Sequence, residues 1–194
     1  MRRRSWLAPA ALACAALLAP TSRAAAAQAV AGFPKKVAAL VTSPMASARQ
    51  ADGMVRLYFA IADELHCLQG NGRDCDGFPV ALGQKVVVIG APAAADLDAD
   101  GSAEVVAALS DGRVVAVRED GSAFGGFSWQ AARGLQTSAS LVDVTGDGQP
   151  EIPIGDKEGR LHALKADGTE AAGFPLGRGG AITSPASWGL FGEP

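Results

Sequence analysis

A short tripeptide recurs along the chain at nearly constant spacing. Gly-Phe-Pro, or a close variant, contains each of four phenylalanines: Phe33, Phe78, Phe127 and Phe174. These are 45, 49 and 47 residues apart, a period typical of stacked supersecondary units. A shift of 47 residues lays residues 95–127 over residues 142–174, with matching aspartates, Gly-Arg and Gly-Phe. A more divergent copy begins near residue 42, so the repeat decides the fold class.

Each copy has the pattern of short β-strands joined by tight turns. Residues 104–110 and 113–119 are apolar, β-branched runs on either side of Asp111-Gly112, a strong hairpin signal. The 24 glycines and 11 prolines interrupt the chain too often for long helices. About four short antiparallel strands in roughly 40 to 50 residues make one propeller blade. The sequence therefore predicts an all-β fold, a β-propeller of four-stranded antiparallel blades.

The number of repeats predicts an incomplete propeller. Three blades are expected at residues 42–84, 85–134 and 135–180, with partial strands at 31–41 and 181–191. Closed propellers have about four to eight blades. We therefore expect an open arc, either as part of a longer propeller or as one completed by association through its open edges.

Residues 1–27 have the pattern of a secretory signal peptide. Three arginines precede an apolar run over residues 6–18, and a run of alanines follows before Gln28. The apolar run is too short to span a bilayer of about 30 Å, so the mature chain is expected to have no transmembrane anchor. The sequence predicts export to the periplasm, the cell surface or the medium, through a Sec or a twin-arginine signal.

Removal of these residues would take away four arginines and no acid, which changes the formal net charge from −3 to −7. No basic stripe is present, so nucleic acid is not an expected partner. Cys67 and Cys75 lie on either side of a loop-like segment. An oxidising compartment favours a local disulfide between them, and a pair of free thiols is the alternative.

An acidic loop separates the first two expected strands of the second copy. Its crowded carboxylates repel one another unless a cation lies between them, and calcium takes about six to eight oxygen ligands. The predicted ligands are the side chains of Asp96, Asp98, Asp100 and Glu104, with the carbonyl of Ser102. An EF-hand would need glutamate at the twelfth loop position, where this chain has Ala107.

The third copy repeats this loop with less charge. Its candidate calcium ligands are Asp143, Thr145, Asp147, Gln149 and Glu151. Because Thr145 replaces an aspartate, we expect weaker binding. The first copy has Ala48, Gln50 and Asp52 at the corresponding positions, and no metal is expected there. The alternative is that Asp-Gly loops only make good turns, but the recurrence of the acids favours metal.

No known catalytic motif is present in the sequence. His66 and His162 occupy equivalent positions in two copies, which favours a structural role over catalysis. The alternative is that two carboxylates from different blades form an acid pair for glycoside cleavage. Trp129 and Trp188 are expected to pack between blades rather than to form a sugar-stacking surface.

The order of these elements resembles the FG-GAP/VCBS repeat family. The resemblance rests on the loops DLDADGSAE and DVTGDGQPE, the hairpins DGRVVAV and EGRLHAL, and the DGxxxxGF endings. It implies a bladed propeller with calcium in inter-strand loops and a surface that meets partners. We therefore expect an exported, non-enzymatic module for binding, adhesion or scaffolding, with a protein or glycan ligand. An extracellular enzyme, or its accessory domain, acting on carbohydrate or phosphoester substrates is the alternative.

Overall fold

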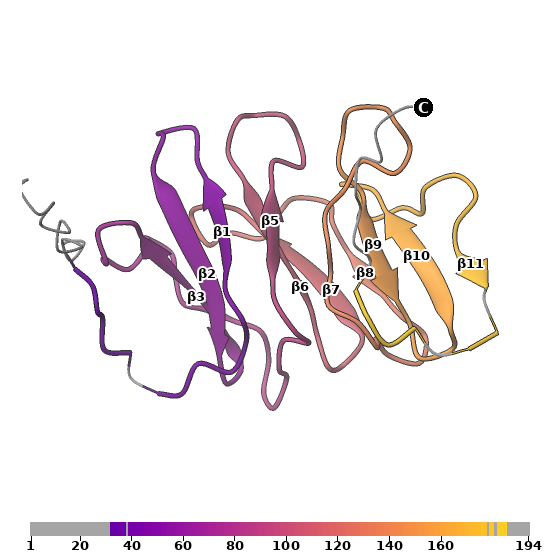
Figure 1. Cartoon of the computed structure of the whole chain (residues 1–194), viewed down its shortest axis with the longest axis horizontal. Helices are drawn as coiled ribbons and strands as arrows, with labels where there is room; N and C mark the ends of the chain where they lie inside the picture. Colours follow the sequence, from indigo (N-terminus) through magenta and orange to yellow (C-terminus); the bar gives the residue numbers. More distant parts are fainter. Residues whose placement is uncertain (1–31, 38, 178, 181, 186–194) are drawn as a thin grey trace, which may run out of the picture.

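The computed structural model describes residues 32–37, 39–177, 179–180 and 182–185. In this part of the chain there are eleven strands and no helix, so no helix there could cross a membrane. The strands form three antiparallel sheets that stand side by side (Figure 1). This arrangement confirms the all-β class and the open arc of propeller blades. The expected signal peptide at 1–27 lies outside the described residues.

Each sheet uses one continuous stretch of chain. Blade 1 consists of β1 (Ala46–Arg49), β2 (Val55–Ile61), β3 (Glu64–Gln69) and β4 (Val80–Ala81). Blade 2 consists of β5 (Ala93–Ala95), β6 (Glu104–Ala108), β7 (Arg113–Val117) and β8 (Trp129–Gln130). Blade 3 consists of β9 (Ile152–Gly155), β10 (Arg160–Leu164) and β11 (Leu176–Gly177). The strands in each blade pair in chain order.

Blade 3 has three strands where four were expected. Among the described residues, the backbone of the segment in the place of its first strand pairs with the sheet at two isolated bridges, Leu135 to Asp156 and Val142 to Glu151. Pro153 lies between these bridges in β9 and has no N–H to give to a neighbouring strand. The Gly155 N–H is bonded to the Thr137 hydroxyl, at 2.9 Å, instead of a backbone carbonyl. Pro153 and Gly155 therefore prevent a regular ladder of backbone hydrogen bonds between β9 and this segment.

The partial strands expected at the two ends are also absent from the described residues. Residues 32–37 correspond to the outermost strand of a preceding blade, but no third strand precedes them in the described part to pair with. Val37 and Val41 instead pack on Phe59 and Ile61, on the face of blade 1 that points away from blade 2. Residues 182–185 likewise form no strand, and residues 186–191 lie outside the described part.

Alternation along the strands builds one core between each pair of blades. Val105 and Val106 are neighbours in β6, and both are fully buried, but they belong to different cores. Val105 packs with Tyr58 and Leu65 of blade 1. Val106 packs with Ile152 of blade 3. Because successive side chains point to opposite faces, the middle sheet is buried on both sides.

The glycine of the Gly-Phe-Pro element packs closely against a turn of the following blade at two of its four copies. Gly77 has a φ of 77°, and a Cβ at this position would overlap the carbonyl of Asp120 in the turn of blade 2. A Cβ on Gly121 would in turn overlap the carbonyl of Gly77. A similar overlap joins Gly32 to Gly72. In the other two copies of the repeat, a Cβ on the glycine would meet no described atom within 4 Å, so the contact requires glycine at two of the four copies.

The expected disulfide is confirmed. Cys67 in β3 is bonded to Cys75, with Cα atoms 5.3 Å apart. Both cysteines are buried in the core between blades 1 and 2, and the Cys75 N–H donates to the Cys67 carbonyl at 3.1 Å. The disulfide therefore closes the loop of residues 67–75, which begins within β3.

Candidate metal centre

The acidic loop of blade 2 links β5 to β6 and projects from the same edge of the arc as the equivalent loops of the other blades (Figure 1). Glu104 is the first residue of β6 and is only 1% exposed. Its Oε2 accepts a hydrogen bond from the Leu97 N–H at 2.9 Å. Leu97 is itself buried in the core between blades 2 and 3. The base of the loop is therefore held by the hydrogen bond to the Glu104 carboxylate and by the buried Leu97 side chain.

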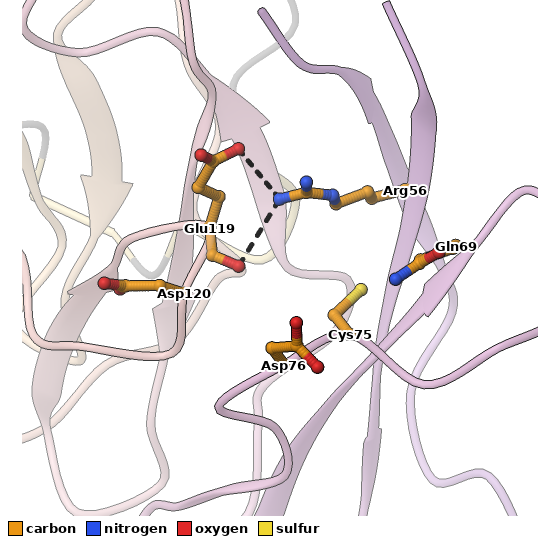
Figure 2. Close-up of a pocket in the computed structure, with 6 residues that line it drawn as sticks. All are labelled: Arg56, Gln69, Cys75, Asp76, Glu119 and Asp120. Atoms are coloured by element: carbon orange, nitrogen blue, oxygen red, sulfur yellow. Dashed lines mark hydrogen bonds and ion pairs between the residues drawn. The ribbon is translucent and has the colours of Figure 1, made fainter. Parts of the chain in front are cut away.

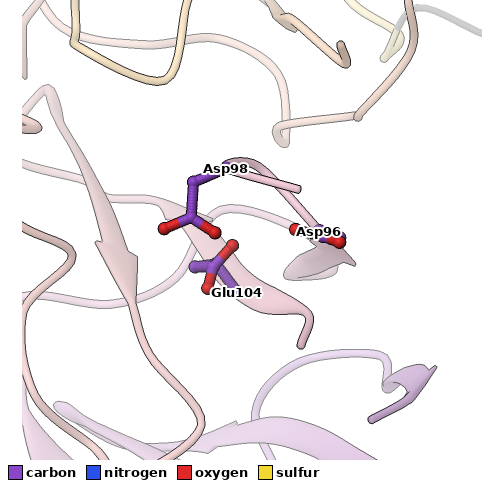
Figure 3. A group of neighbouring side chains, drawn as sticks. All are labelled: Asp96, Asp98 and Glu104. Atoms are coloured by element: carbon purple, nitrogen blue, oxygen red, sulfur yellow. The ribbon is translucent and has the colours of Figure 1, made fainter. Parts of the chain in front are cut away.

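Three of the five predicted ligands come together. One carboxylate oxygen from each of Asp96, Asp98 and Glu104 lies within 4.8 Å of the others. Figure 3 shows the Asp98 and Glu104 carboxylates turned toward each other, with Asp96 to their right. Asp96 also accepts the N–H groups of Asp100 and Gly101, at 3.2 and 2.8 Å. These amides orient the Asp96 carboxylate within the turn.

The other two predicted ligands are placed differently. The Asp100 Oδ1 accepts the Ser102 N–H at 2.7 Å, which makes a local turn within the loop. Asp100 and Ser102 are not part of the three-carboxylate group. The structure therefore separates a compact set of three acids from two residues that shape the loop.

A cation already faces these acids. The Arg118 guanidinium lies 3.1 Å from Asp98, 3.6 Å from Asp100 and 3.8 Å from Glu104. The same guanidinium lies over the Phe124 ring, at 4.8 Å from its centroid. One positive charge against four loop carboxylates leaves the site strongly negative. The site would therefore still attract a small, hard cation.

Glu104 is the most buried acid of the loop. Burial raises the pKa of its carboxyl, and the nearby charges of Asp98 and Asp100 raise it further. Only Oε2 has a hydrogen-bond donor among the described residues, and Oε1 is 3.8 Å from the nearest atom of its Arg118 ion pair. A carboxylate oxygen without a donor, on a residue that is only 1% exposed, is a suitable ligand for a hard divalent cation, because calcium binds oxygen ligands.

The loop of blade 3 keeps its turn but not the ligand cluster. Asp143 accepts the N–H groups of Gly146 and Gly148, at 2.6 and 2.8 Å, and these bonds lower its pKa. The Thr145 hydroxyl donates to Glu151 at 3.0 Å, so the two predicted ligands already bind each other.

The remaining two predicted ligands of this loop also form a turn. Asp147 accepts the Gln149 N–H at 2.9 Å. In the described part of the chain, no three metal-ligating groups of this loop meet as those of blade 2 do. The structure thus places the five predicted ligands of blade 3 in one described loop, but their carboxylate oxygens do not converge on a common point as those of blade 2 do.

The first copy has a different use for the same position. Gln50 is 3% exposed, and its Oε1 accepts the Ala103 N–H of blade 2 at 2.6 Å. Its Nε2 donates to the Tyr58 hydroxyl at 2.8 Å. Asp52 pairs with Arg56 at 3.2 Å. Gln50 thus joins blade 1 to blade 2, whereas the Asp52 ion pair lies within blade 1, and sequence comparison of the loops alone did not reveal either contact.

A pocket between blades 1 and 2 is another candidate site. It is lined by Arg56, Gln69, Cys75, Asp76, Glu119 and Asp120 (Figure 2). Arg56 reaches across the interface, and its Nη1 lies 2.8 Å from the Glu119 Oε2. The pocket's main cation is therefore bound to one of its acids. Its geometry indicates an ion pair between blades 1 and 2.

His162 lies in a buried charged cluster. Its Nδ1 is 2.6 Å from the Glu170 Oε1, and its Nε2 is 3.2 Å from the Asp156 Oδ2. Trp129 of blade 2 meets the His162 ring edge-on, with centroids 4.8 Å apart. Both ring nitrogens face carboxylates, and Trp129 lies between blades as expected. Trp188 lies outside the described residues.

The sequence reasoning missed Arg118 as part of the acidic site. A signal was available, because Lys165 occupies the corresponding position 47 residues later. Lys165 lines a pocket with Asp147 and Glu151, so a basic residue accompanies the acids in both copies. A search for cations as well as acids at the repeat offset would have found it.

Comparison with known proteins gives distant likenesses in structure. No protein-family model and no curated protein sequence matches the chain. The fold is similar to BamB from Moraxella catarrhalis, with 15% identity and a TM-score of 0.46. That similarity covers 68% of this chain and 36% of that one.

The chain is also similar to a protein of unknown function from Bacteroides caccae, with 10% identity and a TM-score of 0.49. The similarity covers 75% of this chain and 49% of that one. The chain thus spans less than half the length of either solved structure.

Proposed function

We propose that this chain is an exported, calcium-stabilised, non-enzymatic repeat module that binds a protein or glycan partner. We further propose that its repeats are divergent relatives of the FG-GAP/VCBS family. The observation that carries the proposal is the convergence of Asp96, Asp98 and Glu104 to within 4.8 Å, at the start of a buried strand.

Calcium fits the donor set of the blade 2 loop. The three converging groups supply only carboxylate oxygens, and one oxygen of Glu104 lacks a hydrogen-bond donor in the described part of the chain. Asp100 and the Ser102 carbonyl are proposed to complete the set with water. A bound ion would offset the repulsion among the acids and order the loop that projects from the edge of the arc.

The blade 3 loop is proposed as a weaker calcium site. Its ligands would be Asp143, Thr145, Asp147, Gln149 and Glu151. The Thr145 hydroxyl would have to leave Glu151 before both oxygens faced an ion, because they are hydrogen-bonded to each other at 3.0 Å. That exchange lowers the gain from binding, which supports a lower affinity than in blade 2.

Export is supported by two independent features. The opening residues have the charge and apolar pattern of a signal peptide. Cys67 and Cys75 form a disulfide, and such bonds persist mainly in oxidising compartments. The two features favour the periplasm, the cell surface or the medium as the location.

Unfolding by heat, with calcium or with EGTA, tests the calcium part of the proposal. At calcium about 100-fold above its Kd, we expect about 2.7 kcal/mol of added stability, which raises Tm by roughly 5 to 10 °C. Magnesium at equal concentration is the control and is expected to have a smaller effect. Equal Tm values in calcium and EGTA would contradict the proposal.

A glycan array and a panel of hydrolase substrates test the binding part. Calcium-dependent capture of a glycan or protein without turnover is the expected result. Hydrolysis that survives substitution of the loop acids would instead support the alternative of an extracellular enzyme or its accessory domain.

A further inference from the structure

We propose that Gln50 of blade 1 is a positioning residue for the calcium site of blade 2, an inference that rests on the proposed function. Gln50 does not reach the site itself. It holds Ala103, which directly precedes Glu104. Blade 1 has thus lost a ligand at this position of the repeat and uses the side chain to orient the ligand loop of its neighbour.

The amide of Gln50 binds both polar groups of one backbone residue. Its Oε1 accepts the Ala103 N–H at 2.6 Å, and its Nε2 donates to the Ala103 carbonyl at 3.2 Å. Both residues are buried, at 3% and 5% exposure. Two bonds to one residue restrict its rotation as well as its position, so they define the direction in which the chain enters β6.

Gln50 is itself held firmly in blade 1. Its N–H donates to the Met54 carbonyl at 2.9 Å, and its carbonyl accepts the Gly53 N–H at 2.8 Å. Its Nε2 also donates to the hydroxyl of Tyr58, which is fully buried. Burial raises the pKa of this hydroxyl. We call the two hydrogen bonds between the Gln50 side chain and Ala103 the Gln50 clamp. Because Gln50 is fixed in blade 1, the clamp fixes Ala103 relative to the core of blade 1.

Glu104 is the ligand that this clamp controls. Its Cα follows Ala103 at the start of β6, and its carboxylate must stay within 4.8 Å of Asp96 and Asp98 for the three acids to share one ion. Residues that orient metal ligands from outside the site typically change metal affinity by about 10- to 100-fold. Loss of the Gln50 clamp should act through the same effect.

The next pair of blades explains why the clamp is not repeated. Gln50 corresponds to Asp98 in blade 2, and Ala103 corresponds to Pro150 in blade 3. Proline has no N–H, so Asp98 has no equivalent donor to bind across the second interface. Asp98 instead faces Arg118 and Glu104. The loop of blade 3 is therefore left without the clamp that the loop of blade 2 has.

Calcium titration followed by amide NMR tests the inference, because Gly101 and Gly148 report on the two loops separately. Gln50→Met keeps the length of the side chain and removes its amide. Ala103→Pro removes the bonded N–H and copies the residue at the corresponding position of blade 3. We expect each variant to weaken calcium binding at Gly101 by about tenfold and to leave Gly148 unchanged.

Tyr58→Phe is the matched control. It removes the other partner of Gln50 within blade 1 but leaves both bonds to Ala103, so Tm should fall while affinity at Gly101 stays within about twofold. Hydrogen exchange of the Ala103 amide provides a second readout, and we expect it to accelerate in Gln50→Met with or without calcium.

The outcomes separate this inference from the proposed function. If neither loop of the wild type responds to calcium, the proposed function fails. If the wild type responds and both Gln50→Met and Ala103→Pro bind calcium at Gly101 as tightly as it does, the inference alone is overturned.

Discussion

The Arg118 Nη2 lies 3.1 Å from the Asp98 Oδ2, so the acidic loop of blade 2 contains its own counter-charge. The guanidinium also stacks over Phe124. Arg118 directly follows β7, whereas Asp98 lies in the loop between β5 and β6. This contact balances part of the repulsion in the loop and competes with an external cation for the same oxygens.

Arg118→Gln should therefore have two opposite effects. Without calcium the variant should be less stable than the wild type, because the loop acids lose a partner. Calcium should bind several-fold more tightly, since one partly exposed ion pair no longer competes for the same oxygens. Thermal unfolding in EGTA and calorimetric titration measure the two effects.

Arg133→Gln is the matched control, because it removes the same charge from an exposed residue that pairs with Glu158 in blade 3. It should leave calcium affinity unchanged. Weaker calcium binding by Arg118→Gln than by the wild type would show that the guanidinium supports the site instead of competing with the ion.

Exchange of one residue between the two loops should exchange their affinities. Thr145→Asp restores the charge of the blade 2 loop in blade 3, and Asp98→Thr makes the reverse change. We expect calcium to bind several-fold more tightly at the blade 3 loop in Thr145→Asp, because an added carboxylate increases the attraction for the ion. NMR shifts of Gly148 measure this affinity, and an unchanged value would argue against a metal role for the loop.

The glycine contact between blades 1 and 2 can be tested by a single methyl group. Gly77→Ala puts a Cβ into the Asp120 carbonyl, whereas Gly173→Ala has a similar φ, 86° against 77°, and no atom within 4 Å. Both variants should lose about 1 kcal/mol or more from backbone strain. Gly77→Ala should lose at least about 2 kcal/mol beyond that in urea unfolding. Equal losses would mean that the contact contributes nothing.

The hairpin of blade 3 should make stability depend on acidic pH. Burial tends to raise the pKa of Asp156, but bonds from the backbone and side chain of Arg160 and from His162 outweigh burial, and the pKa falls from 3.8 to about 2. Because the folded pKa is the lower one, this stabilisation is present above pH 4 and is lost as the pH falls toward 2.

Asp156→Asn should therefore lower the free energy of unfolding by about 2 kcal/mol at pH 7. The difference from the wild type should shrink as both are measured at pH 4, 3 and 2. A difference that stays constant over this range would show that the ionised carboxylate is not what stabilises the hairpin.

The sequence predicts the hairpins, the disulfide and the number of blades, because each depends on residues that are close together in the chain. The Asp111-Gly112 hairpin joins β6 to β7, and the disulfide crosses a separation of 8 residues. Both follow from turn chemistry and short spacing. The number of blades follows from the repeat, because each copy makes the same local pairings.

What the sequence did not predict depends on contacts between residues that are far apart in the chain. Gln50 looked like a lost ligand, yet it binds Ala103, which is 53 residues away. Arg118 reaches Asp98 from 20 residues away. The missing first strand of blade 3 follows from Pro153, whose effect depends on which strand lies beside it. Such partners are known only once the blades are placed side by side.

Calorimetric titration with calcium tests the central claim most directly. The wild type should show a strong binding heat for the blade 2 loop and a weaker one for the blade 3 loop. Asp98→Ala with Asp100→Ala should abolish the strong component and keep the weak one, because it removes two of the loop's four carboxylates. Titration heats unchanged by this double substitution, or no heat from the wild type, would contradict the account.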